Sequence, residues 1–89
     1  MARRCQTPVV PDHRVTLLTR PGCHLCDEAR RVVAAVCGEA GVEWVERDIS
    51  ADPELVRTWT DDVPVTLVDD RHLDSWRVSA DRLRAALRR

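Results

Sequence analysis

Apolar and polar positions in the first half of the chain predict a strand, a helix and a second strand. Val15–Thr19 is a short, apolar, β-branched run that stops at a Pro-Gly turn, which is typical of a buried strand. From Leu25 onward the apolar residues recur at helical spacing, and we expect this helix to end near Gly38 or Gly41. Val42–Arg47 predicts a second strand, which is less apolar and therefore suits a sheet edge.

The second half predicts a helix, two strands and a last helix. Asp52-Pro53-Glu54 combines an N-cap acceptor, a proline and an acid, and so marks a helix start. Val63–Val68 is nearly all apolar and predicts a central strand, after which Asp69–Arg71 turns the chain into a short strand at His72–Leu73. Ser79 caps the last helix, and this order predicts a mixed four-stranded sheet whose first pair is parallel and whose last pair is antiparallel. The inner face of the last helix is expected to hold Leu83, Ala86 and Leu87.

The chain of 89 residues has the length of one compact α/β domain. Residues 1–13 contain two prolines and no periodicity, so we interpret them as a flexible leader before a domain at residues 14–89. A twin arginine near the start lacks the apolar run of an export signal, and no segment approaches the ~20 apolar residues of a membrane span. We therefore expect a monomer in the cytoplasm without a membrane partner.

Charge and cysteine content limit the classes of function that the chain can have. The chain has 14 basic and 15 acidic residues, with a formal net charge of -1. This balance gives no reason to propose nucleic acid as a partner. Disulfides are rare in the reducing cytoplasm, so the four cysteines are not expected to form a disulfide framework. A closely spaced cysteine pair is then either catalytic or metal-binding.

That pair lies in Cys23-His24-Leu25-Cys26, where the first strand ends and the first helix begins. Free N–H groups at a helix start favour a thiolate and can lower the pKa of a cysteine from about 8.5 to between about 3.5 and about 7.5. Cys23 is therefore predicted to attack a disulfide, and Cys26, one turn further, to resolve the mixed disulfide. His24 either stabilises the thiolate when protonated, which would tune the redox potential, or simply faces solvent.

A metal site is the alternative for the same pair. Structural zinc usually takes four ligands, commonly from two such pairs, and this chain has one. Cys37 lies about 16 Å from Cys26 along one helix and is interpreted as a core residue. Cys5, His13 or His72 would have to complete a zinc site or an intersubunit iron-sulfur cluster, so we expect no metal.

A second feature is Val63-Pro64, directly before the third strand. Proline cannot donate a ladder hydrogen bond, so it belongs at the first position of that strand or faces something other than a neighbouring strand. Only about 5% of X-Pro bonds in folded proteins are cis, and the residues themselves leave the isomer open.

These motifs together resemble the small glutaredoxin-like proteins of the thioredoxin superfamily, over about residues 14–89. The resemblance is carried by Val15–Cys26 (VTLLTRPGCHLC), by Val63-Pro64 and by Asp74–Val78 (DSWRV). It implies an α/β, thioredoxin-like fold of the glutaredoxin type, with a four-stranded mixed sheet flanked by three helices in the order βαβαββα. It also implies a thiol-disulfide oxidoreductase that reduces disulfides of proteins or mixed disulfides of low-molecular-weight thiols.

The resemblance further implies a substrate-binding role for Arg20, Val63 and Pro64. Pro64 would be cis and lie beside Cys23, which leaves the Val63 backbone free to pair with substrate. Arg20 stands where glutaredoxins usually carry a lysine and is a candidate for a glutathione carboxylate or for supporting the thiolate. Arg57 is a weaker candidate, and an ordinary solvated arginine is the simpler interpretation.

The chain departs from the glutaredoxin pattern at the glutathione site. Asp62 stands where threonine is typical, and Asp74-Ser75 replaces paired glycines that let the backbone approach glutathione. No bound cofactor is expected, and glutathione, another small thiol such as mycothiol, or a thioredoxin reductase would supply electrons. Trp76 lines a substrate groove or packs at a strand end. The competing hypothesis is a redox-inert thioredoxin-like module that binds a protein partner or a metal.

Overall fold

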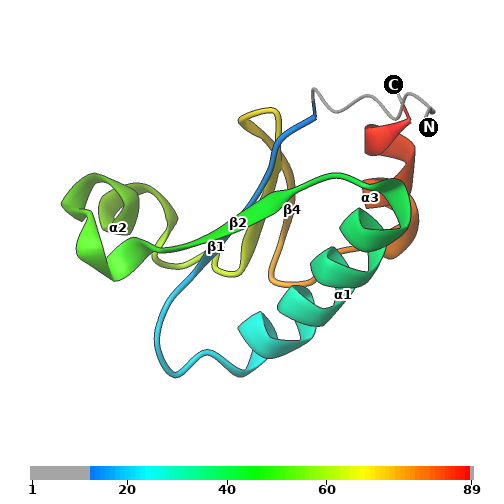
Figure 1. Cartoon of the computed structure of the whole chain (residues 1–89). Coiled ribbons are helices and arrows are strands. Elements are labelled where there is room, and N and C mark those ends of the chain that lie inside the picture. Colours follow the sequence, from blue (N-terminus) through cyan, green and yellow to red (C-terminus); the bar gives the residue numbers. More distant parts are fainter. Residues whose placement is uncertain (1–12, 89) are drawn as a thin grey trace.

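The computed structural model describes residues 13–88, so that all but the last residue of the expected leader lies outside the described part of the chain (Figure 1). The elements are β1 (Val15–Thr19), α1 (His24–Ala40), β2 (Trp44–Asp48), the short 3-10 helix η1 (Ile49–Ala51), α2 (Pro53–Trp59), β3 (Val65–Val68), β4 (Arg71–Ser75) and α3 (Ala80–Leu87). The predicted order is confirmed, with η1 as an addition. No helix among the described residues is long and apolar enough to cross a bilayer.

The four strands form one mixed sheet in the order β2-β1-β3-β4. β1 is parallel to β2 and antiparallel to β3, and β3 is antiparallel to β4. The predicted pairing of the first two and the last two strands is therefore confirmed, as are the edge position of β2 and the central position of β3. Leu18 pairs with Val65, which pairs with Ser75, so the loop after β1, the start of β3 and the end of β4 meet at one end of the sheet.

Three strands have bounds that differ from the prediction, and the backbone hydrogen bonds near their ends explain the differences. β2 begins at Trp44 because the N–H of Val42 donates to Cys37 O (3.0 Å) and so completes the end of α1. β3 begins at Val65, since Pro64 has no N–H for the ladder. β4 has five residues rather than two, because it pairs with the whole of β3 across a register shift between Thr66 and Leu67.

The predicted N-cap residues of α2 and α3 are confirmed. The Asp52 side chain accepts from the N–H of Glu54 at 2.9 Å and caps α2, and the Ser79 hydroxyl accepts from the N–H of Arg82 at 3.2 Å and caps α3. α1 ends at Ala40, and Gly41 forms its C-cap with φ 70, which settles the choice left open between Gly38 and Gly41.

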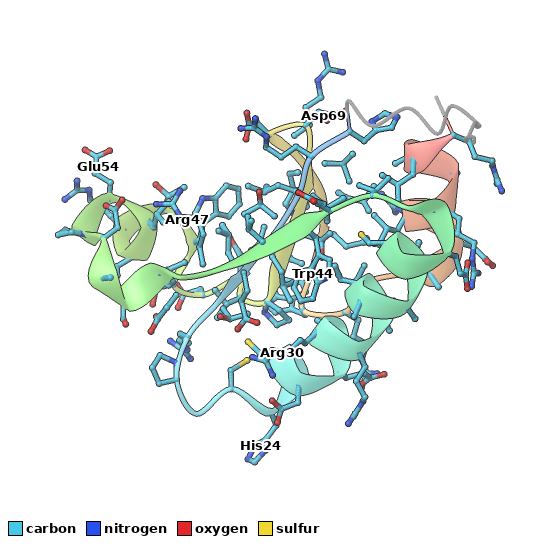
Figure 2. All side chains as sticks on the ribbon, viewed as in Figure 1. His24, Arg30, Trp44, Arg47, Glu54 and Asp69 are labelled. Carbon is cyan, nitrogen blue, oxygen red and sulfur yellow. The ribbon has the colours of Figure 1, made fainter. Side chains whose placement is uncertain are left out.

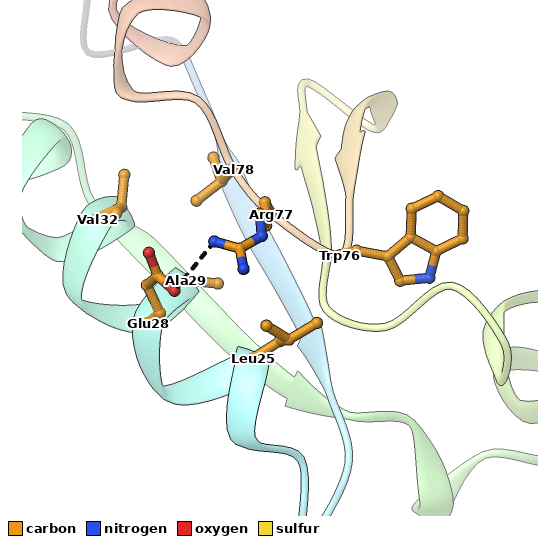
Figure 3. Close-up of a pocket in the computed structure, with 7 residues that line it drawn as sticks. All are labelled: Leu25, Glu28, Ala29, Val32, Trp76, Arg77 and Val78. Carbon is orange, nitrogen blue, oxygen red and sulfur yellow. Dashed lines mark ion pairs between the residues drawn. The ribbon is translucent and has the colours of Figure 1, made fainter.

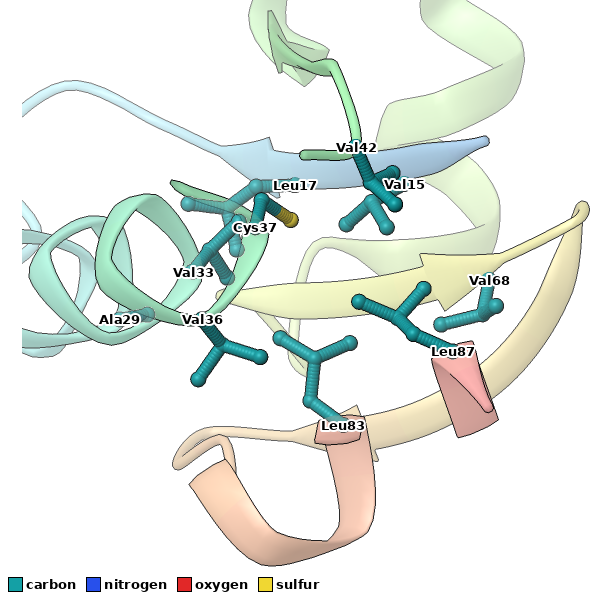
Figure 4. Close-up of a cluster of buried hydrophobic side chains, with 10 residues drawn as sticks. All are labelled: Val15, Leu17, Ala29, Val33, Val36, Cys37, Val42, Val68, Leu83 and Leu87. Carbon is teal, nitrogen blue, oxygen red and sulfur yellow. The ribbon is translucent and has the colours of Figure 1, made fainter. Parts of the chain in front are cut away.

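Two clusters of buried residues lie on opposite faces of the sheet. The larger one packs α1 and α3 against the sheet, and Leu83 and Leu87 are buried there as predicted, with Ala86 partly buried (Figure 4). Its members are Val15, Leu17, Ala29, Val33, Val36, Cys37, Val42, Val68, Leu83 and Leu87. The smaller cluster packs η1 and α2 against the other face, and consists of Leu18, Ile49, Val63 and Val65. Alternation along β1 explains this split, because Leu17 and Leu18 point to opposite faces.

Candidate active site

Cys23 is the N-cap residue of α1, one position before the first helical residue His24. Its backbone is extended (φ -96, ψ 112), and Gly22 before it adopts φ 78, a conformation that suits glycine. The Cys23 side chain makes no capping hydrogen bond, and the residue is half-buried, whereas Cys26 is buried. The unpaired N–H groups of the first helical turn and the helix dipole favour negative charge there.

Cys26 lies one turn into α1 and is 2% exposed. Burial raises the pKa of its thiol to about 11, and a hydrogen bond with the Cys23 side chain adds to this increase. The backbone of Arg20 and the charge of Arg30 act in the opposite direction. The two cysteines are therefore close together, one partly accessible and the other sheltered and protonated at neutral pH.

Arg30 follows Cys26 by one turn of α1 and is fixed by two carboxylates (Figure 2). Its guanidinium donates twice to Glu46 on β2, at 2.7 Å each, and once to Asp27 at 2.8 Å. Thr19 donates to the same Glu46 carboxylate at 3.0 Å. These bonds lower the pKa of Glu46, so that the pair stays charged. Sequence reasoning missed Arg30, although its spacing of four residues from Cys26 on one helix was a usable signal.

The Val63-Pro64 peptide bond is cis, as the resemblance implied. Pro64 directly precedes Val65, the partner of Leu18, and so lies at the end of the sheet from which the chain continues to Cys23. The carbonyl of Pro64 accepts from the N–H of Trp76 at 2.8 Å. Within residues 13–88 the backbone N–H and C=O of Val63 have no hydrogen-bond partner, although Val63 is only 6% exposed.

The side chains of Arg20 and His24, which flank the cysteine pair, form no hydrogen bond or ion pair with it. The guanidinium of Arg20 is directed to the end of α2, where it donates to the hydroxyl of Thr60 at 3.4 Å. Figure 2 shows His24 pointing outward from the start of α1, which agrees with the interpretation that it faces solvent. Arg57 is an exposed residue of α2 paired with Glu54 at 3.5 Å, so it fits the description of a solvated arginine.

The residues in place of the paired glycines serve the turn into α3. The carboxylate of Asp74 accepts from the N–H of Ser79 at 3.1 Å and pairs with Arg82 at 3.7 Å. The hydroxyl of Ser75 bonds the ring of His72 at 2.8 Å. Asp74 is thus engaged with the start of α3 rather than directed as a free charge at the cysteines.

The candidate partners for a metal are occupied elsewhere or lie outside the described residues. His72 stacks on Trp59 with ring centroids 5.9 Å apart, and His13 pairs with Asp69 at 2.8 Å. No group of three metal-binding side chains gathers anywhere in residues 13–88. Cys5 belongs to the part of the chain that the structure does not describe.

Comparison with known proteins concerns the family and the fold. A family model described as "Glutaredoxin-like domain (DUF836)" matches residues 14–88. An uncharacterized protein of Mycobacterium tuberculosis is 33% identical over 81 residues, which cover 85% of this chain and 84% of that protein. The X-ray structure of a protein from X. campestris is 33% identical and has a TM-score of 0.68, covering 83% of this chain and 95% of that one. Chloroplastic thioredoxin z, at 13% identity and a TM-score of 0.70, covers 90% of this chain and 80% of its own, and shows the same fold.

Proposed function

Because the chain belongs to the glutaredoxin-like domain family and has a thioredoxin-like fold, we propose that it is a thiol-disulfide oxidoreductase acting through Cys23 and Cys26. One observation carries the proposal: an accessible thiol at the start of α1 is hydrogen-bonded to a buried thiol one turn away. An accessible sulfur beside free N–H groups suits attack, and a sheltered neighbour suits a second step that begins only after the first.

The reaction has two steps that together move two electrons. The Cys23 thiolate attacks one sulfur of a substrate disulfide, a mixed disulfide forms, and the other substrate sulfur leaves as a thiolate that takes up a proton. Cys26 then loses its proton and attacks the Cys23 sulfur. The Cys23–Cys26 disulfide forms and the second substrate thiol is released. The substrate is reduced by two electrons and the protein is oxidised by two.

The backbone of Val63 is the proposed docking point for substrate. The N–H and C=O of Val63 have no partner within residues 13–88, and an unpaired N–H or C=O in a residue that is only 6% exposed is costly, so a partner from outside this part of the chain is favoured. An extended substrate segment supplies both partners when it lies along Val63 as an added strand. This segment would bring its disulfide to the end of the sheet that carries Cys23.

The electrons that restore the dithiol come from outside the chain. The candidates are a small thiol such as glutathione or mycothiol, and a thioredoxin reductase. Asp62 lies next to Val63, and its negative charge disfavours the anionic tripeptide glutathione there. We therefore place mycothiol or a reductase ahead of glutathione, and the rate at which each one reduces the oxidised protein tests that order.

The dithiol cycle is tested by reaction with an aromatic disulfide, dithiobis(2-nitrobenzoate), in a Cys5→Ser background. The reduced parent protein is expected to release two thionitrobenzoate ions per chain quickly, one for each step. Cys26→Ser is expected to release one and to retain the other in a mixed disulfide that mass spectrometry detects. Cys23→Ser is expected to react slowly, since Cys26 is buried and protonated.

Cys37→Ala is the matched control, because Cys37 is also a buried thiol but lies in the main core cluster. It should react like the parent protein. Slow reaction of Cys23 near neutral pH, or release of a single ion by the parent, would contradict the dithiol cycle and favour the redox-inert binding module.

A further inference from the structure

Trp76 is the most exposed large apolar residue among the described residues, with 54% of its surface accessible. It also adopts φ 66, in the left-handed region that a bulky side chain rarely occupies. Such a conformation costs of order 1 kcal/mol or more and persists only where surrounding contacts impose it. An exposed ring gains little from burial in return for that cost.

The hydrogen bonds that hold Trp76 in this conformation run across its own turn, where the N–H of Arg77 donates to the carbonyl of Ser75 at 2.7 Å, and to the loop before β3. The N–H of Trp76 donates to the carbonyl of Pro64 at 2.8 Å and, more weakly, to that of Asp62 at 3.4 Å. The indole N–H donates to the carbonyl of Asp61 at 3.0 Å. The only polar group of the ring is thus satisfied, the ring is held in place, and its remaining exposed surface is apolar.

Residues 76–78 also contact α1, on the side away from the loop before β3. Arg77 pairs with Glu28 at 3.7 Å, and a hollow of about 20 Å³ separates Trp76 and Val78 from Leu25 and the rest of that helix face. Figure 3 shows the indole of Trp76 turned away from this hollow and from Arg77. The hollow is too small for a side chain of a ligand, and the ring itself takes no part in this packing.

Trp76 lies at the end of the sheet where the residues of the proposed reaction meet. It follows Ser75, the partner of Val65, and Val65 pairs in turn with Leu18. At this end of the sheet, its neighbours across the strands are therefore the Val63–Pro64 segment and the loop that leads to Cys23. A substrate strand that pairs with Val63 must pass close to the fixed, exposed face of the indole.

We propose that Trp76 determines substrate specificity by contacting an apolar side chain next to the reacting cysteine of a polypeptide disulfide. This inference rests on the proposed function and adds the class of substrate. The backbone groups of Val63 hold an extended peptide, and the indole face packs on a side chain of that peptide. A small thiol disulfide has no such side chain and gains nothing from the ring.

The test uses two peptides that each carry one cysteine in a mixed disulfide with thionitrobenzoate, flanked by Leu in one and by Ser in the other. The second-order rate constant for release of thionitrobenzoate by reduced protein measures the first step. The unmodified protein should prefer the Leu peptide by roughly tenfold, the low end of what an apolar contact discriminates. Trp76→Gly should bring the ratio of the two rate constants close to one, and glycine adopts the local φ without strain.

Two further variants decide whether the ring itself is responsible. Trp76→Phe keeps an aromatic face and should retain most of the preference, although it loses the bond to Asp61. Val45→Ala removes another exposed apolar side chain, 52% accessible on β2, and should leave the ratio unchanged. Equal loss on both peptides, loss of preference in Trp76→Phe, or no preference in the unmodified protein would overturn the inference. Failure of the unmodified protein to react with either peptide would instead overturn the proposed function.

Discussion

At the scale of single residues, the site contains two opposing influences on Cys26. Burial raises the pKa of its thiol, which keeps it inactive while Cys23 is free. The resolving step nevertheless requires Cys26 to lose a proton, and the positive charge of Arg30 favours that loss. Glu46 and Asp27 hold the guanidinium in place. Because Arg30 acts on the reaction only through the pKa of Cys26, it is a positioning residue for the second step rather than a catalytic one.

Replacing Arg30 is expected to slow the resolving step only. Arg30→Gln should reduce the rate of the second thionitrobenzoate release about two- to threefold at neutral pH, the size expected for a partly exposed charge. The slower phase should also require a higher pH to reach its maximum, because Cys26 then holds its proton more strongly. Stopped-flow absorbance at a series of pH values measures both phases.

Arg30→Lys keeps the charge and should restore most of that rate, which separates the charge from a packing effect. Arg31→Gln changes an exposed arginine one position further along α1 and serves as the control. A pH profile of the second phase that is identical in Arg30→Gln and the parent protein would refute this role.

At the scale of elements, the turn into α3 shows how a few polar side chains position a helix. Asp74 accepts from the N–H of Ser79, and Ser79 accepts from the N–H of Arg82. Together they fix the start of α3, which carries Leu83 and Leu87 into the main core cluster.

Loss of the α3 cap is expected to lower stability without changing the cysteine chemistry. Ser79→Ala should reduce the free energy of unfolding by about 1 kcal/mol, the usual value for a lost N-cap hydrogen bond. Urea unfolding measures this change. Thr58→Ala, at an exposed position of α2, is the control and should stay within roughly 0.5 kcal/mol of the parent protein. Equal stability of the two variants would show that the cap contributes little.

The elements that the sequence predicted well are those fixed by local chemistry. The caps at Asp52 and Ser79 were predictable because a side chain accepts from an N–H two or three residues away. The length of β4 was not, because its extra residues are strand only through pairing with β3. Hydrophobic alternation does not contain that information.

The same distinction applies to the site. The proximity of Cys23 and Cys26 follows from their spacing at a helix start, and the sequence predicted it. The direction of Arg20 toward Thr60 and the left-handed backbone of Trp76 depend on contacts between residues far apart in the chain. The isomer of the Val63-Pro64 bond was implied only by family resemblance.

At the scale of the whole molecule, the buried thiol of Cys37 makes the free energy of unfolding depend on pH. Its side chain is 0% exposed, and burial raises the pKa of the thiol to about 11. In the unfolded chain the same thiol ionises at about pH 8.5. Between these two values the unfolded state releases a proton that the folded state keeps, so the free energy of unfolding must fall as pH rises.

The Cys37 thiol alone is expected to cost on the order of 2 kcal/mol of stability between about pH 7.5 and about pH 10.5. Urea unfolding of the fully reduced protein at both pH values measures this loss. Cys37→Ala should lose markedly less, because it has no thiol to ionise. Val36→Ala creates a space in the same cluster without removing a thiol, so its loss with pH should equal that of the parent protein. If Cys37→Ala and Val36→Ala lose stability equally, the alkaline sensitivity of the fold has another origin, and Cys26 is the remaining buried thiol of the described residues to which it can be assigned.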